Sequence, residues 1–324
     1  MEQHKELRIV YMGTPGFAVE PLRAICSNGY NVMAVVTAPD KPAGRGRKLK
    51  SSPVKQFADS NSISVLQPTN LKDERFVSEL KSLNADIFVV VAFRMLPKVV
   101  WKIPKLGTFN LHASLLPQYR GAAPINWAVI NGEKKTGVTT FLIDEKIDTG
   151  SILLKQETEI TPDETAGELH DKLMQIGASV VVKTLEMLKE GAEPTPQYKL
   201  VAQDEKLKPA PKLFRENLRV NWALPAIEVH NFIRGLSPYP AAWTEMVDDA
   251  GDKVSVKVYR SSVVDKNQQE LTEGSILTDS KSYIHVVCGK GIVAVNELQL
   301  AGKRRLTAKE FLVGFNRLAG FHFV

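Results

Sequence analysis

The sequence predicts an α/β protein, with a doubly wound, mostly parallel sheet followed by a smaller antiparallel β-barrel. Over the first 190 residues, apolar strand-like runs alternate with amphipathic helical segments, which is typical of a Rossmann-like sheet. A proline-rich stretch then breaks this pattern. The short alternating strands beyond it are typical of a small, OB-like barrel. A chain of 324 residues also exceeds one ordinary core, so two domains are expected.

The first domain, expected over residues 1–190, opens with a strand and a glycine turn. Residues 8–12, RIVYM, are largely apolar, and Gly13 and Gly16 permit a tight turn into an amphipathic helix. The turn lacks the G-x-G-x-x-G pattern of dinucleotide-binding proteins, and no acidic residue ends the next strand, NVMAVVT. The sequence therefore disfavours a nicotinamide oxidoreductase, and a purely structural turn is the preferred interpretation.

Residues 37–58 form a long segment whose prolines and glycines are expected to exclude regular structure across most of its length. Within it, residues 41–50 carry no acidic side chain and these basic ones: Lys41, Arg45, Arg47, Lys48 and Lys50. A loop of this length inside a compact α/β unit is usually functional or disordered. Two interpretations stay open, a phosphate-binding loop and a solvated flexible loop.

The rest of the first domain continues the alternation of strands and helices. Residues 85–93, ADIFVVVAF, read as a fully buried strand of the parallel type. Further strands are expected at Val65 and at residues 109–112, 137–144 and 150–160. Helices are expected at residues 71–83, 125–132 and 164–191, with a short helix or turn at 97–101. In such a sheet, ligands bind at the carboxyl ends of the strands.

A linker is expected at residues 191–211, which contain Pro194, Pro196, Pro209 and Pro211. The second domain, residues 212–324, is expected to contain a helix that Pro238 stops. This helix covers residues 226–236, and a last helix covers residues 308–318. Between them, strands are expected at residues 242–247, 253–264, 274–278, 283–289 and 291–300.

Charge, cysteine content and hydropathy narrow the class of protein. The net charge is +6 and the pI is near 9.1, which allow a polyanionic partner without requiring one. Cys26 and Cys288 are the two cysteines, too few for a disulfide framework or a metal cluster. No metal is therefore expected, and a reducing cytoplasm is the expected compartment. No signal peptide or membrane-spanning run is visible, so no membrane partner is expected. The protein is also expected to be a monomer.

Three polar residues, Asn110, His112 and Asp148, stand in otherwise apolar surroundings at expected strand ends. Residues two apart in a strand point to the same face, so Asn110 and His112 would project together. Asp148 lies where a turn into Gly150 can return its carboxylate to them. A donating amide, an imidazole that donates or accepts, and an accepting carboxylate are sufficient for acyl-type transfer to an amine. Taken singly, the histidine could instead be a satisfied core residue and the aspartate a turn residue.

Several stretches of the sequence are similar to those of one enzyme family. They are YMGTPGFA, APDKPAGRGRKLKSSPVK, NLHASLLPQYRGAAPIN, IDEKIDTG and AGKRR. Together they resemble the methionyl-tRNA formyltransferases over nearly the whole chain. The SLLPxYRGxxP and DTG motifs are shared by the wider group of formyl-tetrahydrofolate enzymes, whereas the long basic loop and the barrel behind a linker narrow the resemblance. The sequence departs from the family at Arg94 and Met95, where a small residue and a longer apolar run are more common.

The resemblance implies that the co-substrate 10-formyltetrahydrofolate donates a formyl group to the α-amine of methionine on initiator tRNA. It implies that Asn110, His112 and Asp148 are catalytic. From their chemistry we expect Asp148 to orient the imidazole and to help accept or relay the proton, and Asn110 to donate to the developing oxyanion. It assigns the folate-site loop to Ser114, Leu115, Leu116 and Pro117. It also implies RNA contacts by Arg45, Arg47, Lys48, Lys212 and Arg304.

Two alternatives remain open beside this resemblance. A formyltransferase acting on an amino-sugar or a purine-pathway amine would use the same three residues, but would need neither the basic loop nor an RNA-contacting barrel. A non-catalytic RNA-binding protein on the same fold would bind tRNA without binding folate. The intact set of three polar residues disfavours the second alternative.

Overall fold

The computed structural model describes residues 7–43, 48–202, 206–267, 270–315 and 318–324. The chain divides into two compact units, and each unit is made of segments that are not contiguous in the sequence. The first unit consists of the chain up to Gly121, Gly137–Thr158 and His170–Pro209, and the second of Ala122–Thr136, Glu159–Leu169 and Ala210–Val324. The contiguous boundaries expected from the sequence, at residues 190 and 212, stay a prediction.

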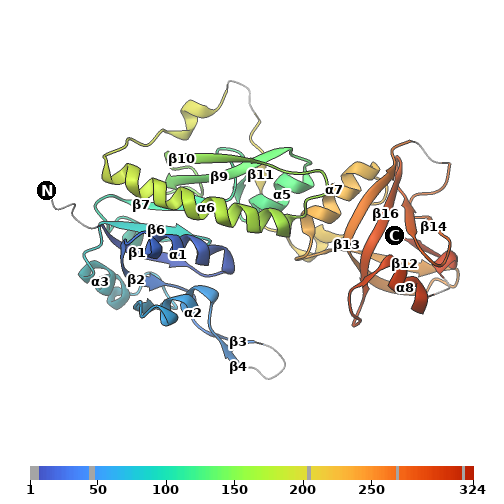
Figure 1. The fold of residues 1–324 in the computed structure, drawn as a ribbon, viewed down its shortest axis with the longest axis horizontal. Helices are drawn as coiled ribbons and strands as arrows, with labels where there is room; N and C mark the ends of the chain where they lie inside the picture. Colours follow the sequence, from blue (N-terminus) through green and yellow to red (C-terminus); the bar gives the residue numbers. More distant parts are fainter. Residues whose placement is uncertain (1–6, 44–47, 203–205, 268–269, 316–317) are drawn as a thin grey trace. The chain divides into compact units, whose positions relative to one another are not determined.

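The first unit is built on a seven-stranded sheet with the strand order β10-β9-β7-β6-β1-β2-β5 (Figure 1). Its strands are β1 Arg8–Gly13, β2 Asn31–Val36, β5 Val65–Leu66, β6 Ile87–Val91, β7 Thr108–His112, β9 Lys135–Leu142 and β10 Ile152–Glu159. β1 pairs in parallel with β2 and β6, β2 with β5, and β6 with β7, whereas β7 pairs antiparallel with β9. The predicted mostly parallel sheet is confirmed.

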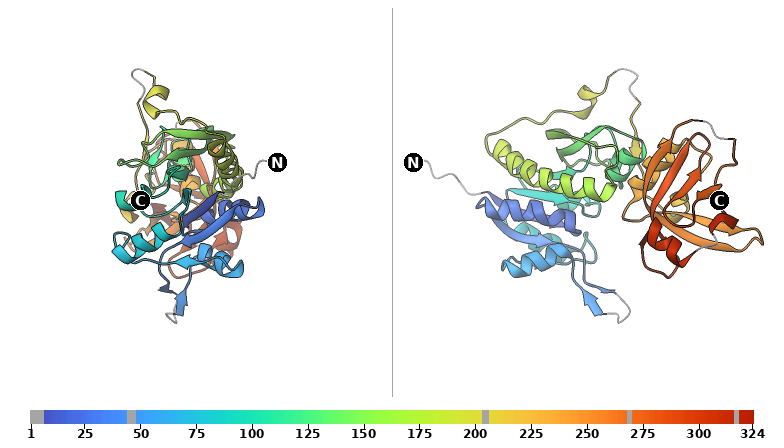
Figure 2. Two further views of the ribbon diagram at one scale, coloured as in Figure 1. Left: turned by 90° about the vertical axis from the view of Figure 1, so that its left-hand side faces the viewer. Right: turned by 45° about the vertical axis from the view of Figure 1, so that its right-hand side comes forward.

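Helices cover both faces of this sheet, as the left view of Figure 2 shows with the sheet nearly edge-on. α3 (Glu74–Ser82) and α4 (Lys98–Trp101) share one apolar cluster with alternate residues of β1 and β6. α1 (Val19–Ser27) and α6 (Ala166–Lys189) lie on the opposite face. The expected short helix at residues 97–101 is thus present, and the sheet is doubly wound.

The segment after β2 differs from the irregular loop that its prolines and glycines suggested. It contains an antiparallel hairpin of β3 (Lys41–Ala43) and β4 (Lys48–Lys50), with Pro42 opposite Leu49. An isolated two-stranded ribbon tolerates proline because its outer edges need no further partner. The expectation of irregular structure is therefore wrong for these strands. Arg45 and Arg47 lie outside the described residues.

α2 (Pro53–Ser60) begins directly after this hairpin. Ser52 caps it, because its hydroxyl accepts a hydrogen bond from Lys55 N at 3.0 Å. Proline is also favourable at the first helical position, where its missing N–H would have no intrahelical partner. Pro53, which the sequence analysis counts among the breakers, therefore starts a helix here.

The second unit is an antiparallel sheet with the order β14-β15-β16-β13-β12-β18, to which β17 adds beside β16. Its strands are β12 Ala242–Asp248, β13 Lys253–Asp265, β14 Ile276–Thr278, β15 Ile284–Val287, β16 Ile292–Leu300, β17 Leu306–Thr307 and β18 Phe321–Phe323. Ser275, just before β14, pairs with His322 of β18 in an isolated antiparallel bridge. Because this bridge joins the two ends of the sheet, the sheet is a nearly closed barrel, as predicted.

Three helices complete the second unit. α7 covers Ala226–Leu236 and stops before Pro238, as expected. α5 (Pro124–Ile130) packs against it where a Cβ on Gly235 would lie 2.6 Å from the Ile130 side chain, so only glycine permits this approach. α8 covers Ala308–Gly314 and begins with a capping box between Thr307 and Glu310. It ends four residues before the expected residue 318, at a glycine, which is a poor helix former.

His230 of α7 is buried against residues of the same unit. Its Nδ1 lies 3.0 Å from the Ser261 hydroxyl, and its Nε2 lies 3.3 Å from the Pro162 carbonyl oxygen. Since a carbonyl can only accept, Nε2 carries the proton and donates. Burial lowers the pKa of His230 below its ordinary value of 6.5, and the positive charge of Arg234 adds to this effect. The folded protein therefore favours the neutral imidazole.

This environment predicts a loss of stability in mild acid. Because the folded pKa lies below the unfolded one, the contribution of His230 is fully present above about pH 6.5 and is lost as the pH falls through the folded pKa. We expect the calorimetric unfolding midpoint to fall between pH 7.5 and pH 5.5, and to fall less in His230→Gln. The exposed His322→Gln is the matched control. Equal pH dependence of His230→Gln and the wild type would contradict this prediction.

Candidate active site

β7 carries Asn110 and His112 on one face of the sheet. The residue between them, Leu111, points the other way, because its side chain meets α6 at Gly177, where an added Cβ would lie 2.7 Å from Leu111 Cδ2. Across the strand pair, Leu111 is opposite Thr140, whose hydroxyl lies 2.7 Å from that of Thr184 in α6. Asn110 and His112 therefore project away from α6, as their spacing predicted.

The orientation of the His112 ring is fixed by the main chain of Tyr119. His112 Nε2 lies 2.9 Å from the Tyr119 carbonyl oxygen. A carbonyl oxygen accepts and never donates, so Nε2 must carry the proton in the neutral ring. Nδ1 is then left with its lone pair, and it lies 3.8 Å from Asp148 Oδ2. The side chains of His112 and Asp148 are only 8% and 13% exposed, so a positive charge formed on the imidazole would interact with the Asp148 carboxylate with little screening by water.

Asp148 reaches this position through an unusual turn. Its backbone has φ of +54°, in the left-handed region that few residues other than glycine adopt. Its Oδ2 accepts a hydrogen bond from Gly121 N at 2.9 Å. Two residues on, a Cβ at Gly150 would lie 1.6 Å from the Leu142 carbonyl oxygen, so the chain can pass there only as glycine. The Asp-Thr-Gly sequence thus returns the carboxylate to β7, as expected.

Asn110 contains a buried acceptor without a partner. Its Oδ1 is shielded from solvent, and no hydrogen-bond donor reaches it within the described residues. Leaving such a group unsatisfied costs about 1–3 kcal/mol. A native structure tolerates this cost rarely, and often where a ligand supplies the missing donor. Asn110 therefore marks a position where a bound molecule with an N–H or O–H group would gain binding energy.

The Ser-Leu-Leu-Pro loop after β7 is anchored mainly through its own main chain. Thr139 Oγ1 donates to the Ser114 carbonyl oxygen at 2.7 Å and accepts from Leu116 N at 3.1 Å. Ser114 and Leu116 are fully buried, and Pro117 is also buried, whereas Leu115 is half-buried. The side chains of Ser114 and Leu116 are thus part of the interior, and Leu115 is the residue of this loop that is partly exposed. The expected folate contacts of these four residues stay a prediction.

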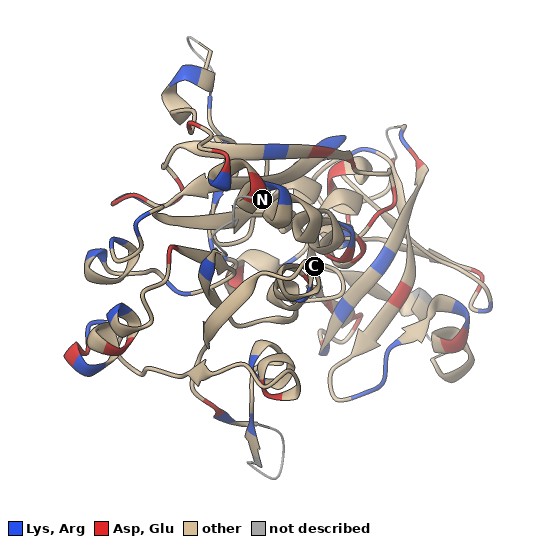
Figure 3. Cartoon of the chain, turned by 60° about the vertical axis from the view of Figure 1, so that its left-hand side comes forward, with Lys and Arg blue, Asp and Glu red and all other residues tan. Residues whose placement is uncertain are grey.

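Two of the expected RNA-binding residues, Lys212 and Arg304, lie on exposed surface. Lys212 is exposed, with its ammonium 5.4 Å from the centre of the Phe214 ring, and Arg304 is also exposed. Lys48 belongs to β4. In the view of Figure 3, Lys and Arg lie among Asp and Glu along the helices and loops. Their predicted contacts with RNA remain untested by this geometry.

Arg94, where the sequence departs from the family, is tied to a neighbouring loop. Its guanidinium donates to the carbonyl oxygens of Pro68 and Thr69. Partial burial lowers the pKa of Arg94 relative to its ordinary value. Met95 beside it is 70% exposed. Arg94 therefore stabilises the strand-end region after β6.

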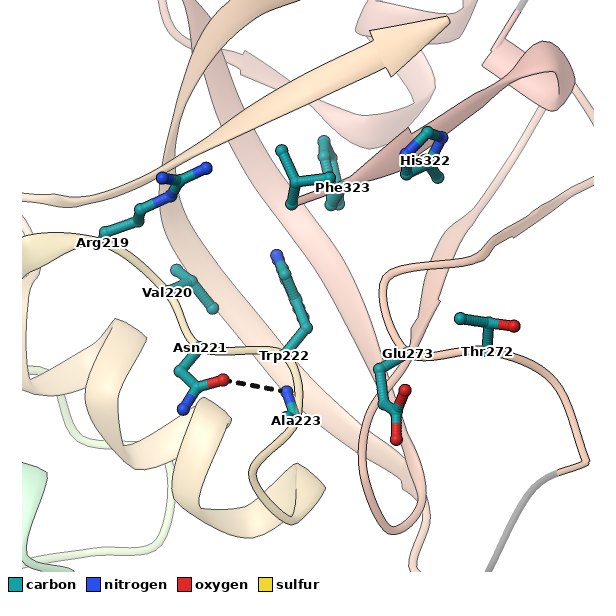
Figure 4. Close-up of a pocket in the computed structure, with 10 residues that line it drawn as sticks. Arg219, Val220, Asn221, Trp222, Ala223, Thr272, Glu273, His322 and Phe323 are labelled. Carbon is teal, nitrogen blue, oxygen red and sulfur yellow. Dashed lines mark hydrogen bonds between the residues drawn. The ribbon is translucent and has the colours of Figure 1, made fainter. Parts of the chain in front are cut away.

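A cavity of about 560 Å³ lies in the barrel unit and is shown in Figure 4. Among its lining residues are Arg219, Asn221, Trp222, Glu273, His322 and Phe323. Several of their polar groups are already engaged within the unit. Trp222 Nε1 donates to Thr244 Oγ1 at 3.0 Å, and Arg219 pairs with Glu245 at 2.8 Å. None of the residues predicted from the sequence to be functional lines this cavity.

Two negative findings concern only the described ranges of the chain. Within them, His, Cys, Asp and Glu side chains form no group of three that could hold a metal ion. Among the helices in these ranges, none combines the length and the apolar character that crossing a bilayer demands.

The arrangement has the parts of an acyl-transfer site. His112 offers one unprotonated nitrogen in a fixed direction, which suits a general base. Asp148 lies beside that nitrogen, where a carboxylate would stabilise the positive charge of a protonated imidazole. Asn110 adds an amide on the same strand face, with an acceptor that no donor reaches within the described residues and a donor that suits a developing oxyanion.

Sequence reasoning missed the main-chain groups that position these side chains. The Tyr119 carbonyl orients His112 and the Gly121 N–H fixes Asp148, yet every residue carries such groups, so no residue type signals them. Glycine at position 121, where φ is +125°, is the one available hint of an unusual backbone. The hydrogen bond that orients the imidazole comes from Tyr119, and the 3.8 Å between His112 Nδ1 and Asp148 Oδ2 exceeds hydrogen-bond distance. A contribution of Asp148 to the orientation of the ring stays a prediction.

The sequence of this chain matches two protein families and a bacterial protein. The family described as Formyl transferase matches residues 7–185, and the Formyl transferase C-terminal domain matches residues 212–316. The methionyl-tRNA formyltransferase of Bacteroides fragilis is 51% identical over 318 residues, which cover 98% of this chain and 98% of that protein.

Solved structures share the fold. An N-formyltransferase of Helicobacter canadensis, in complex with folinic acid and dTDP-3-aminofucose, has a TM-score of 0.64 at 21% identity and covers 89% of this chain and 98% of its own. HypX of Aquifex aeolicus, in complex with tetrahydrofolic acid, has a TM-score of 0.60 at 17% identity. The match covers 97% of this chain and 48% of HypX.

The hydrogen bond to Tyr119 predicts the tautomer of His112. We expect the neutral ring to carry its proton on Nε2, because the carbonyl at 2.9 Å can only accept. Nitrogen NMR of histidine-labelled protein at about pH 8 checks this, with the His112→Gln variant assigning the signal. A neutral ring protonated on Nδ1 would show that the site is arranged differently.

Proposed function

The chain belongs to the methionyl-tRNA formyltransferase family, and we infer from this that it formylates the α-amino group of initiator methionyl-tRNA for translation initiation. The observation that carries this conclusion is the 51% identity over 98% of the chain to a relative of that name. That similarity spans both compact units of the chain. We further propose that the formyl donor is 10-formyltetrahydrofolate and that the site on β7 performs the transfer.

His112 is the proposed base. The α-amine attacks the formyl carbon as the neutral amine, a form favoured because an aminoacyl ester amine is more acidic than an ordinary amine. As the new nitrogen–carbon bond forms, this nitrogen must lose one of its two protons to a base. His112 Nδ1 is the nitrogen free to accept this proton. Asp148, 3.8 Å from Nδ1, stabilises the imidazolium once it forms. The proton then passes to N10 of the departing folate, so the nitrogen–formyl bond that breaks is balanced by the one that forms.

Asn110 is the proposed oxyanion donor. Its amide N–H₂ donates to the formyl oxygen as negative charge develops there. Its Oδ1, which has no donor within the described part of the chain, accepts a hydrogen bond from the attacking amine. One side chain would thereby contact both reacting groups. The shielding of Oδ1 from water suits this role, because a hydrogen bond made there does not compete with solvent.

A folate co-substrate is supported by the family and by the tetrahydrofolate complex of HypX. One observation in this chain fits a bound folate. The buried Asn110 Oδ1 has no donor within the described residues, so a bound molecule could supply one. We propose that the Ser114–Pro117 loop binds the folate through its backbone and Leu115. When bound, this molecule supplies the activated formyl group.

The tRNA is the proposed second substrate. The basic segment with Arg45, Arg47 and Lys48, together with Lys212 and Arg304, supplies the positive charge that phosphates require. We propose that these residues contact the tRNA and that the enzyme acts as a monomer in the cytoplasm. An amino-sugar substrate is the alternative that the Helicobacter neighbour raises, but its 21% identity supports only the shared fold.

A formylation assay distinguishes these substrates. With 10-formyltetrahydrofolate present, we expect rapid formylation of methionyl initiator tRNA and much slower formylation of elongator methionyl-tRNA. Omitting the folate is the control, and dTDP-amino-sugars test the alternative. Product on the sugar nucleotide but none on the charged initiator tRNA would overturn the proposed substrate.

Substitutions test the three proposed catalytic residues. We expect Asn110→Ala to lower the single-turnover rate about 10²–10³-fold because an oxyanion donor is lost. His112→Ala should lower it about 10²–10⁴-fold because the base is lost, and Asp148→Ala should also slow it because the imidazolium loses its counter-charge. Asn61→Ala, at an exposed position, is the matched control. Near wild-type rates for any two of the three variants would remove this assignment.

A further inference from the structure

Gln197 lies outside every element to which the sequence assigned a function, yet its side chain reaches the candidate site. It begins the 3-10 helix η2 (Gln197–Leu200), in the segment that follows α6. Just before it, Thr195 and Ile152 of β10 form an antiparallel bridge, with N–O distances of 2.8 and 2.7 Å. This bridge fixes the backbone beside β10, and the Gln197 residue is only 3% exposed.

All four hydrogen-bonding positions of the Gln197 amide are used. Its Nε2 donates to the carbonyl oxygens of Asp148 at 3.0 Å and Gly150 at 2.8 Å. Its Oε1 accepts from Arg120, at 2.6 Å from Nη2 and 3.2 Å from Nε. Because carbonyls only accept and a guanidinium only donates, the orientation of the amide is determined without ambiguity.

These contacts join the two loops that position the candidate catalytic pair. Arg120 stands between Tyr119, whose carbonyl orients His112, and Gly121, whose N–H binds the Asp148 carboxylate. The other half of the amide binds the main chain on either side of Thr149, where Asp148 has its left-handed backbone. A non-glycine residue stays in that conformation only when its surroundings fix it. Gln197 supplies two of those fixing contacts.

We propose that Gln197 is a positioning residue for the transfer reaction, which acts by keeping the Asp148 carboxylate beside His112 Nδ1. This inference rests on the proposed catalytic role of Asp148. It differs from a purely structural role in one respect. The effect of Gln197 on the rate should depend on the Asp148 carboxylate being present, because Gln197 itself does not contact the reacting groups.

Two substitutions separate the two halves of the amide. Gln197→Leu removes all four hydrogen bonds at similar size. Gln197→Glu keeps an acceptor for Arg120 but replaces the two donors with oxygens that face carbonyl groups. We expect both to lower the single-turnover rate about 10- to 100-fold at saturating tRNA and folate, because small misplacements of a catalytic group have effects of this size. The KM for tRNA should stay within about twofold. Gln156→Leu, an exposed glutamine on β10, is the control.

A double-mutant cycle with Asp148→Asn gives the decisive readout. If Gln197 acts through Asp148, Gln197→Leu should lower the rate of Asp148→Asn by less than about threefold, although it lowers the wild-type rate far more. An equal loss in both backgrounds would overturn the inference, as would a wild-type rate in Gln197→Leu and Gln197→Glu. Circular dichroism checks folding, and Gln197→Glu alone completes the cycle if Gln197→Leu does not fold.

Failure of this inference can be told apart from failure of the catalytic assignment. If Asp148→Asn alone reacts at the wild-type rate, the proposed role of Asp148 is wrong and the inference falls with it. If Asp148→Asn is slow but the Gln197 variants are not, the catalytic assignment stands and only the role of Gln197 is wrong.

Discussion

The hydrogen bond from His112 Nε2 to the Tyr119 carbonyl is the contact on which the candidate site depends. It fixes the ring, it determines which nitrogen carries the proton, and it leaves Nδ1 directed toward Asp148. If the proton were on Nδ1 instead, the nitrogen beside the carboxylate could not act as the base. The Tyr119 carbonyl therefore determines which ring nitrogen of His112 is available to accept a proton.

The site is assembled at the end of β7 by two loops that are far apart in the sequence. The loop after β7 supplies the Tyr119 carbonyl and the Gly121 N–H, and the turn after β9 supplies Asp148. Both contain backbone with positive φ, at Tyr119, Gly121 and Asp148. Such backbone persists only where neighbouring contacts fix it. The segment that contains Gln197 supplies such contacts, because its side chain is hydrogen-bonded to Arg120 in one loop and to the Asp148 and Gly150 carbonyls in the other.

Local sequence patterns predicted the elements that depend on local periodicity. Apolar runs identified β1 and β6, and the spacing of two residues placed Asn110 and His112 on one strand face. Predictions based on single breaker residues were less successful. Pro42 lies in the β3–β4 hairpin and Pro53 starts α2, because a proline is excluded from a ladder or helix interior but is accepted at an edge or a first turn.

The sequence by itself determined the two-part α/β and barrel architecture, the three polar residues and, through the motifs around them, the family. The tertiary structure alone decided that Tyr119 orients the imidazole, that Asp148 faces Nδ1 and that Gln197 binds both loops. The physical reason is that main-chain donors and acceptors are the same in every residue, so their positions depend on how the chain folds. Arg120 and Gln197 are separated by 77 residues, and only the folded chain brings them together.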